Sequence, residues 1–104
     1  QTKFSPETCF EIRNVQTGAC YNHNPRILPV YMGVFQTNKM SVCFTACNGY
    51  RYAGMEARMS CFCGNDLHHL PVDPRECNEK CLGDKLQTCG GDWRINISKI
   101  NAGN

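Results

Sequence analysis

The chain has 104 residues, nine of them cysteine, and a formal net charge of +2 at pH 7. That length corresponds to a single domain, and so small a domain is often marginally stable without cross-links. The near-neutral charge, with lysines and arginines scattered along the chain, argues against nucleic acid as a partner. The cysteine content indicates a secreted, extracellular protein, because a reducing cytosol would not keep the disulfides.

The sequence also indicates how the chain is divided. It holds no apolar stretch long enough to span a membrane, so we expect no membrane insertion. It holds no recognisable signal peptide, so we expect a processed mature chain. We divide it into an N-terminal arm and strand at residues 1–19, a disulfide-rich domain at 20–98 and a tail at 99–104.

The first third of the chain is expected to be extended. Residues 9–13 alternate weakly between apolar and polar side chains, which predicts a first strand. Residues 22–25 have the composition of a turn, because Asn and Pro favour turns. Residues 26–32 are predicted to be extended, and Pro29 within them indicates a sheet edge or a bend.

A short helix is predicted around two cysteines that lie four positions apart. Ser41 is a suitable N-cap, and Asn48-Gly49 is suited to end a helix in the left-handed conformation. Cys43 and Cys47 would share one face of this helix, separated by about 6 Å along its axis. Its apolar residues point to more than one side, so we expect the helix to be well buried.

The next segment supplies a matching pair of cysteines. A strand predicted at residues 59–63 carries Cys61 and Cys63, separated by about 6.6 Å on one face. The two spacings nearly match, so the helix can lie on the strand and be joined to it by two disulfides. Pairing within either couple is unfavourable, because Cys61 and Cys63 are too close in sequence and Cys43–Cys47 would constrain only one helical turn.

A second helix is predicted to begin at Asp73. There an Asp cap is followed by Pro at the first helical position and Glu at the third. The helix would run to Leu82 and stop at Gly83. Cys77 and Cys81 would then lie one turn apart on one face.

The last predicted strand covers residues 93–98 and alternates with a period of two. Ile95 and Ile97 are expected to point inward. Asn96-Ile97-Ser98 matches the acceptor sequence for N-glycosylation. We expect Asn96 on the outward side of the strand, where a glycan can be attached.

Eight of the nine cysteines, with the residues between them, carry a resemblance to a known family. The matching blocks are Ala19-Cys20-Tyr21, Arg26-Ile27-Leu28, Met40-Ser41, Gly49-Tyr50-Arg51-Tyr52-Ala53-Gly54-Met55-Glu56, Cys61-Phe62-Cys63-Gly64-Asn65, Cys81-Leu82-Gly83-Asp84, Cys89-Gly90-Gly91 and Arg94-Ile95. With these blocks in register from Cys20 to about Ser98, the chain resembles a WSC domain. The resemblance covers roughly three quarters of the chain.

The resemblance implies a fold and a disulfide pairing. The fold is α+β, a small disulfide-rich single domain similar to PAN/apple domains, with an antiparallel sheet stapled to one or two short helices. The implied disulfides are Cys20–Cys77, Cys43–Cys61, Cys47–Cys63 and Cys81–Cys89. Cys9 lies outside this pattern and is the candidate for an intermolecular disulfide, which would make a covalent homodimer.

The resemblance also implies a function. WSC domains are extracellular recognition modules of yeast wall-stress sensors, polysaccharide-degrading enzymes and animal receptors, and their shared proposed ligand is carbohydrate, notably β-glucan. Such a site stacks an aromatic ring on the C–H face of a sugar, flanked by amide and charged groups that bind the hydroxyls. The predicted glycan-binding residues are Tyr21, Asn22, Tyr50, Tyr52, Asn65, Asp66, Trp93 and Arg94.

Two alternatives stay open. Tyr50, Tyr52 and Trp93 are also candidates for the core of a domain that is short of core residues. The chain is alternatively a secreted protein ligand, or a matrix or signalling component, that uses the WSC fold without binding sugar. An exposed aromatic cluster around Tyr21 and Trp93 would favour glycan binding, and a flat apolar patch with buried aromatics would favour a protein partner.

Metal binding and catalysis have weak support. His68-His69 could ligate a metal, but no second Cys or His pair at zinc spacing remains once the cysteines are oxidised. Adjacent histidines of this kind are more typical of plain surface. No motif brings together a nucleophile, a base and an orienting residue. We therefore expect no enzymatic activity, no cofactor and no metal.

Overall fold

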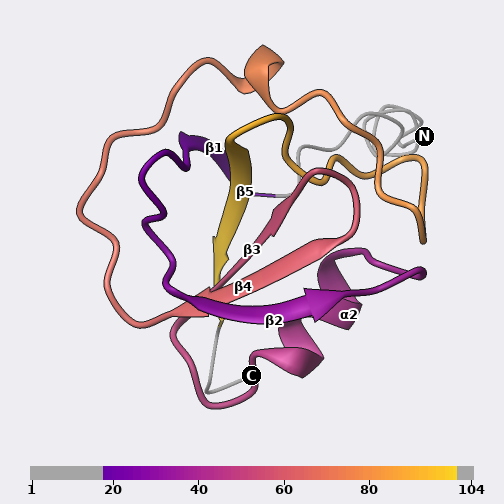
Figure 1. Ribbon diagram of the computed structural model, residues 1–104, viewed down its shortest axis with the longest axis horizontal. Coiled ribbons are helices and arrows are strands. Elements are labelled where there is room, and N and C mark those ends of the chain that lie inside the picture. Colours follow the sequence, from indigo (N-terminus) through magenta and orange to yellow (C-terminus); the bar gives the residue numbers. More distant parts are fainter. Residues whose placement is uncertain (1–17, 101–104) are drawn as a thin grey trace, which may run out of the picture.

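The computed structural model describes residues 18–100, and it shows one antiparallel sheet with a short helix packed on it (Figure 1). The strand order is β1-β5-β3-β4-β2, so β1 and β2 are the two edges. The elements are β1 (Ala19–Asn22), β2 (Val30–Val34), α2 (Met40–Ala46), β3 (Tyr52–Glu56), β4 (Ser60–Gly64), the 3-10 helix η2 (Pro74–Glu76) and β5 (Arg94–Lys99). This is the small disulfide-rich α+β fold that was predicted. The strand predicted at 9–13 and Cys9 lie outside the described residues.

One side of the sheet, the disulfide face, packs against α2. Two disulfides join the helix to β4, Cys43–Cys61 and Cys47–Cys63, with Cα–Cα separations of 5.6 and 5.5 Å. The matched spacing of cysteines on the helix and strand is therefore confirmed. The buried cluster on this side consists of Cys43, Cys47, Ala53, Met55, Cys61, Cys63, Cys81 and Cys89.

The other two disulfides fix the long connection between β4 and β5. Cys20–Cys77 joins β1 to the residue that follows η2, and Cys81–Cys89 closes a small loop. All four pairs are those that the resemblance implies. Every one of these eight cysteines is buried.

The opposite side of the sheet, the loop face, is covered by residues 23–29. Its buried cluster consists of Leu28, Phe62, Ile95 and Ile97. Gly54 lies at the centre of this side, because it pairs with Phe62 on β4 and with Ile97 on β5. A Cβ there would come within 2.6 Å of Ile95 and 2.9 Å of Leu28, so any larger residue would have to displace these buried side chains. No cysteine contributes to the cluster on this face.

The predicted helix boundaries need two corrections. Helix α2 has Lys39 as its N-cap, two residues before the expected Ser41; Lys39 is extended and makes no side-chain cap, and Ser41 lies inside the first turn. The N–H of Met40 instead donates to the side-chain oxygen of Gln87 at 2.9 Å, a partner far away in sequence.

Within residues 18–100, no helix is both long enough and apolar enough to span a membrane.

The helix predicted from residue 73 to 82 is wrong beyond its first turn. Asp73 does act as the cap, because its carboxylate accepts from the N–H of Arg75 at 2.9 Å, but η2 ends at Glu76. The chain then runs extended beside residues 87–91, where Glu79 accepts from the N–H of Cys89 at 2.8 Å. This local pairing replaces the helical hydrogen bonds that the cap would otherwise start.

The last strand was predicted correctly in its inward residues but not in its outward one. Ile95 and Ile97 are buried as expected. Asn96 is also 0% exposed: its side-chain oxygen accepts from Gly90 N–H at 2.7 Å, and its NH₂ donates to the Gly18 carbonyl at 3.2 Å. The expectation of an outward Asn96 is therefore wrong, and the folded domain has no room for a glycan on it.

Candidate functional site

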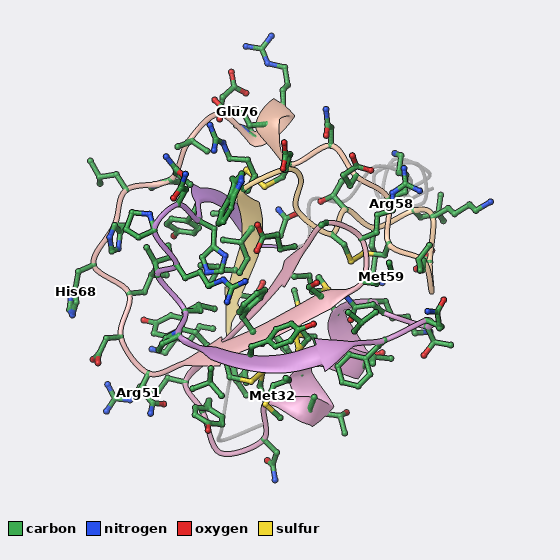
Figure 2. All side chains as sticks on the ribbon, in the orientation of Figure 1. Met32, Arg51, Arg58, Met59, His68 and Glu76 are labelled. Atoms are coloured by element: carbon green, nitrogen blue, oxygen red, sulfur yellow. A yellow bond between two sulfur atoms is a disulfide. The ribbon has the colours of Figure 1, made fainter. Side chains whose placement is uncertain are left out.

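The eight predicted glycan-binding residues divide into two groups at opposite ends of the sheet. Asn22 pairs with Arg94 at the start of β5, and Tyr52 pairs with Lys99 at its end. These positions are five residue steps apart along the strand, about 17 Å. We call the groups the Trp93 end (Tyr21, Asn22, Trp93 and Arg94) and the Tyr52 end (Tyr50, Tyr52, Asn65 and Asp66). Figure 2 shows Glu76, which contacts Arg94, and Arg51, which precedes Tyr52, on opposite sides of the molecule.

The Trp93 end presents an exposed indole on a fixed backbone. Trp93 is 46% exposed, and its φ of +56° is the left-handed conformation that bulky residues rarely adopt. Its carbonyl accepts from the N–H of His23 at 2.9 Å and from the guanidinium of Arg94 at 3.0 Å. These two bonds hold the unusual turn, and strained backbone of this kind occurs often at functional sites.

Arg94 organises the polar groups around this turn. Its Nε donates to the carboxylate of Glu76 at 2.5 Å, and its Nη1 donates to Oδ1 of Asn22 at 3.3 Å. Oδ1 of Asn22 also accepts from the N–H of Asn24 at 3.0 Å, so this side chain is held from two directions. The guanidinium thereby joins β1, β5 and η2 in one network.

Beside this network lies an open hollow of about 580 Å³ with a polar lining. It is lined by Glu76, Asn78, Glu79, Asp92 and Arg94. Glu79 pairs with the side chain of Arg58 at 2.8 Å, whereas Asp92 makes no ion pair within residues 18–100. Carboxylates, an amide and a guanidinium are the groups that bind sugar hydroxyls, so the hollow offers donors and acceptors, and two of its lining residues, Asp92 and Arg94, flank Trp93 in the sequence.

The Tyr52 end is built differently, because its aromatic side chains serve packing. Tyr50 is half-buried against the cluster of the disulfide face, and Tyr52 is half-buried against that of the loop face. The side chain of Asn65 accepts from the N–H of Arg51 at 3.0 Å and so fixes a turn. Asp66 is exposed. At the other end, Tyr21 also packs half-buried against the loop-face cluster.

A third group on the loop face was not recognised from the sequence as a site. The guanidinium carbon of Arg26 lies 5.1 Å from the ring centre of Phe62 and 5.9 Å from that of Tyr31. The two rings are tilted by 44°, with centres 5.2 Å apart. Tyr31 is 50% exposed on the edge strand β2. We call these three residues the Arg26 platform.

A buried histidine supports this platform from below. His23 is fully buried, its Nδ1 lies 2.8 Å from Oε1 of Glu56, and its ring meets Phe62 edge-on at 4.8 Å. Nε2 of His23 accepts from the N–H of Leu28 at 3.3 Å. The ring proton therefore lies on Nδ1 and is donated to the carboxylate.

The possible metal ligands within residues 18–100 carry no metal-site geometry. His68 and His69 are exposed, and Figure 2 shows His68 pointing away from the domain. The sulfur atoms of Cys43, Cys47 and Cys61 lie within 4.8 Å of one another. All three are bonded in disulfides, however, and a metal binds a thiolate.

Comparison with known proteins gives consistent matches over this region. The model of the WSC domain matches residues 17–91. Kremen protein 1 of Xenopus laevis is 43% identical over 75 residues, 64% of this chain and 17% of that protein. A WSC domain-containing protein of Arthroderma benhamiae is 32% identical over 84 residues, 77% of this chain and 12% of that protein. Xylosyltransferase oxt of Drosophila pseudoobscura is 36% identical over 91 residues, 81% of this chain and 10% of that protein.

Proposed function

This chain belongs to the WSC domain family, and we propose that it is a secreted module that binds polysaccharide or glycoprotein glycans through its Trp93 end. WSC domains are non-enzymatic modules of extracellular or cell-surface proteins, and four disulfides fit that location. The chain spans at most 17% of the three relatives described, so their whole activities are not transferred to it.

The observation that carries the proposal is an exposed Trp93 whose chain neighbours, Asp92 and Arg94, both line a polar hollow. An indole ring supplies a flat apolar surface for the C–H face of a hexose. Asn78, Asp92 and the Arg94 network then lie where ring hydroxyls can be bound. The turn is fixed by backbone hydrogen bonds before any ligand arrives, so little ordering is needed on binding.

The test is binding of the oxidised protein to a panel of soluble and insoluble polysaccharides and to a glycan array, β-glucan included. Trp93→Ala is expected to weaken binding about tenfold or more, which corresponds to about 1.4 kcal/mol. Leu70→Ala is the matched control, because Leu70 is 88% exposed and lies outside the hollow. Undiminished binding by a folded Trp93→Ala protein would contradict the proposal.

A second candidate function is that of a protein ligand or a matrix or signalling component. It is favoured by exposed apolar residues on the edge strand β2, at Tyr31, Met32 and Val34. Near them is an open, mainly apolar hollow of about 450 Å³, lined by Phe35, Ser41, Val42, Thr45 and Ala46. The absence of binding to every polysaccharide of the panel, by a protein shown to be folded, would favour this function.

Cys9 bears on either function, because a symmetric Cys9–Cys9 disulfide would double the binding sites and raise avidity on a multivalent surface. This homodimer stays a prediction, since Cys9 lies outside the described residues. Non-reducing electrophoresis is expected to show a dimer that Cys9→Ser abolishes. A monomeric wild-type protein would contradict the prediction.

A further inference from the structure

We propose that Arg26 and Tyr31 form a second binding surface, separate from the polar hollow at the Trp93 end, for sugars that carry a negative charge. The chemical group recognised is the carboxylate of a uronic acid or a sulfate ester, held by Arg26 while the sugar ring lies on Tyr31. This inference goes beyond the proposed function, because it assigns a different ligand class to different residues.

The first support is the state of the Arg26 charge. Its side chain is exposed, and no carboxylate of residues 18–100 forms an ion pair with it. Glu56, on the same side of the sheet, is instead bound to the ring of His23. The aromatic rings of Phe62 and Tyr31 cover Arg26 from one side. A guanidinium stacked in this way keeps its N–H groups available at the edge, in the fork geometry that fits a carboxylate or sulfate.

The second support is that the platform is held in place before a ligand binds. Arg26 lies in a loop that is anchored on both sides, by His23 bonded to Glu56 and by the buried Leu28. The N–H of Leu28 closes the loop on Nε2 of His23. Phe62 beneath the guanidinium is only 2% exposed, so its ring is fixed by the core. Anchoring of this kind reduces the conformational entropy lost on binding.

The third support is the exposure of Tyr31. Half of this side chain is accessible, and its hydroxyl makes no hydrogen bond with residues 18–100. β2 is an edge strand, so the platform lies at the margin of the sheet. The tyrosine ring is therefore a free stacking surface within reach of the Arg26 charge.

The local charge of this surface differs from that of the hollow at the Trp93 end. The hollow is lined by three carboxylates, of which Glu76 pairs with Arg94 and Glu79 with Arg58. Asp92 makes no ion pair within residues 18–100, so its negative charge is not compensated. An acidic sugar would be repelled there, whereas the platform offers an unpaired positive charge. The two surfaces thus fit different ligands, a neutral glycan at Trp93 and an acidic one at Arg26.

The test compares Arg26→Gln with Arg51→Gln, which removes the same charge at a matched position. Arg51 is exposed, makes no ion pair within residues 18–100, and lies at the margin of the domain in Figure 2. Binding is measured by isothermal titration calorimetry with three probes: oligogalacturonate, dextran sulfate and an uncharged β-1,3-glucan. Near-ultraviolet circular dichroism of each variant confirms that it is folded.

We expect Arg26→Gln to weaken binding of an acidic probe at least tenfold, and Arg51→Gln to change it less than twofold. The probe that responds identifies the acidic group as carboxylate or sulfate. Tyr31→Ala is expected to act in the same direction as Arg26→Gln.

Two results would overturn the inference. Equal losses in the two arginine variants would show only general charge attraction, and wild-type protein that binds neither acidic probe would show no site. Binding of the neutral glucan and its loss in Trp93→Ala are read separately, so failure of the Trp93 site is distinguishable from failure of the Arg26 platform.

Discussion

The two sides of the sheet are stabilised in different ways. On the disulfide face, six of the eight clustered residues are cysteines, and α2 is joined to β4 by two bonds. On the loop face, the cluster has no cysteine, and residues 23–29 are held by hydrogen bonds and apolar contacts. A small domain that is covalently fixed on one side can leave large side chains exposed on the other. The Arg26 platform lies on the loop face. The carbonyl of Trp93 accepts a hydrogen bond from the N–H of His23, in the loop that covers this face.

Removing a disulfide from the disulfide face is expected to have the largest effect on stability. The Cys43→Ala/Cys61→Ala variant opens a loop of 18 residues, which on the chain-entropy model lowers the free energy of unfolding by about 3 kcal/mol. The measurement is urea unfolding of the purified protein at 25 °C.

The matched control for that variant is Cys81→Ala/Cys89→Ala, whose loop is only 8 residues long. The same model gives it a smaller loss, about 2.5 kcal/mol. A larger loss for this control than for the α2 disulfide would contradict the expectation that the bond closing the longer loop contributes more to stability.

On the loop face, His23→Ala is expected to lower the free energy of unfolding by about 2 kcal/mol. The variant leaves the nearly buried carboxylate of Glu56 and the N–H of Leu28 without their partner. Glu56→Gln should cost less, because its amide oxygen can still accept from His23. Equal losses in urea unfolding of the two variants would show that the hydrogen bond to His23 is not what holds the loop.

The elements of the two faces differ in how far the sequence predicts them. The cysteine spacing on α2 and β4 was recognisable because the helical and strand periods are fixed by backbone geometry. Strand β3 was not recognised, because Tyr52–Glu56 is buried on both sides and so shows no polar alternation. The alternating pattern also gave the wrong orientation for Asn96, because alternation alone does not show that both sides of a strand are buried.

The candidate site was predictable only in part for a similar reason. Trp93 and Arg94 were identified by residue type, but their distance from Tyr52 depends on strand order, which no local pattern contains. His23 was taken for a turn residue because Asn and Pro surround it. Its burial depends on Glu56, which is 33 positions away. The stacking of Arg26 on Phe62 and Tyr31 likewise depends on pairing between β2 and β4.

The smallest predicted effect concerns η2, which belongs to neither cluster. Hydrogen bonds from the side chain and backbone of Arg75 lower the pKa of Asp73 from 3.8 to about 2. A lowered carboxyl pKa stabilises the folded state above the unfolded value, and this contribution is lost as pH falls from about 3.8 to about 2. Carboxyl-carbon NMR should give a titration midpoint for Asp73 near 2. A midpoint near 3.8 would show that the cap does not hold in solution.

The proposal that glycan binds at the Trp93 end is tested most directly by NMR mapping. ¹⁵N-labelled protein is titrated with an uncharged β-glucan oligosaccharide, and shifts are followed for the indole N–H of Trp93 and the backbone amides. Saturable shifts at Trp93, Arg94, Asp92 and Asn22, with none at Tyr50 or Tyr52, are the predicted result. Shifts centred on Tyr50, Tyr52 and Asn65 instead, or on the apolar hollow beside α2, would contradict this account.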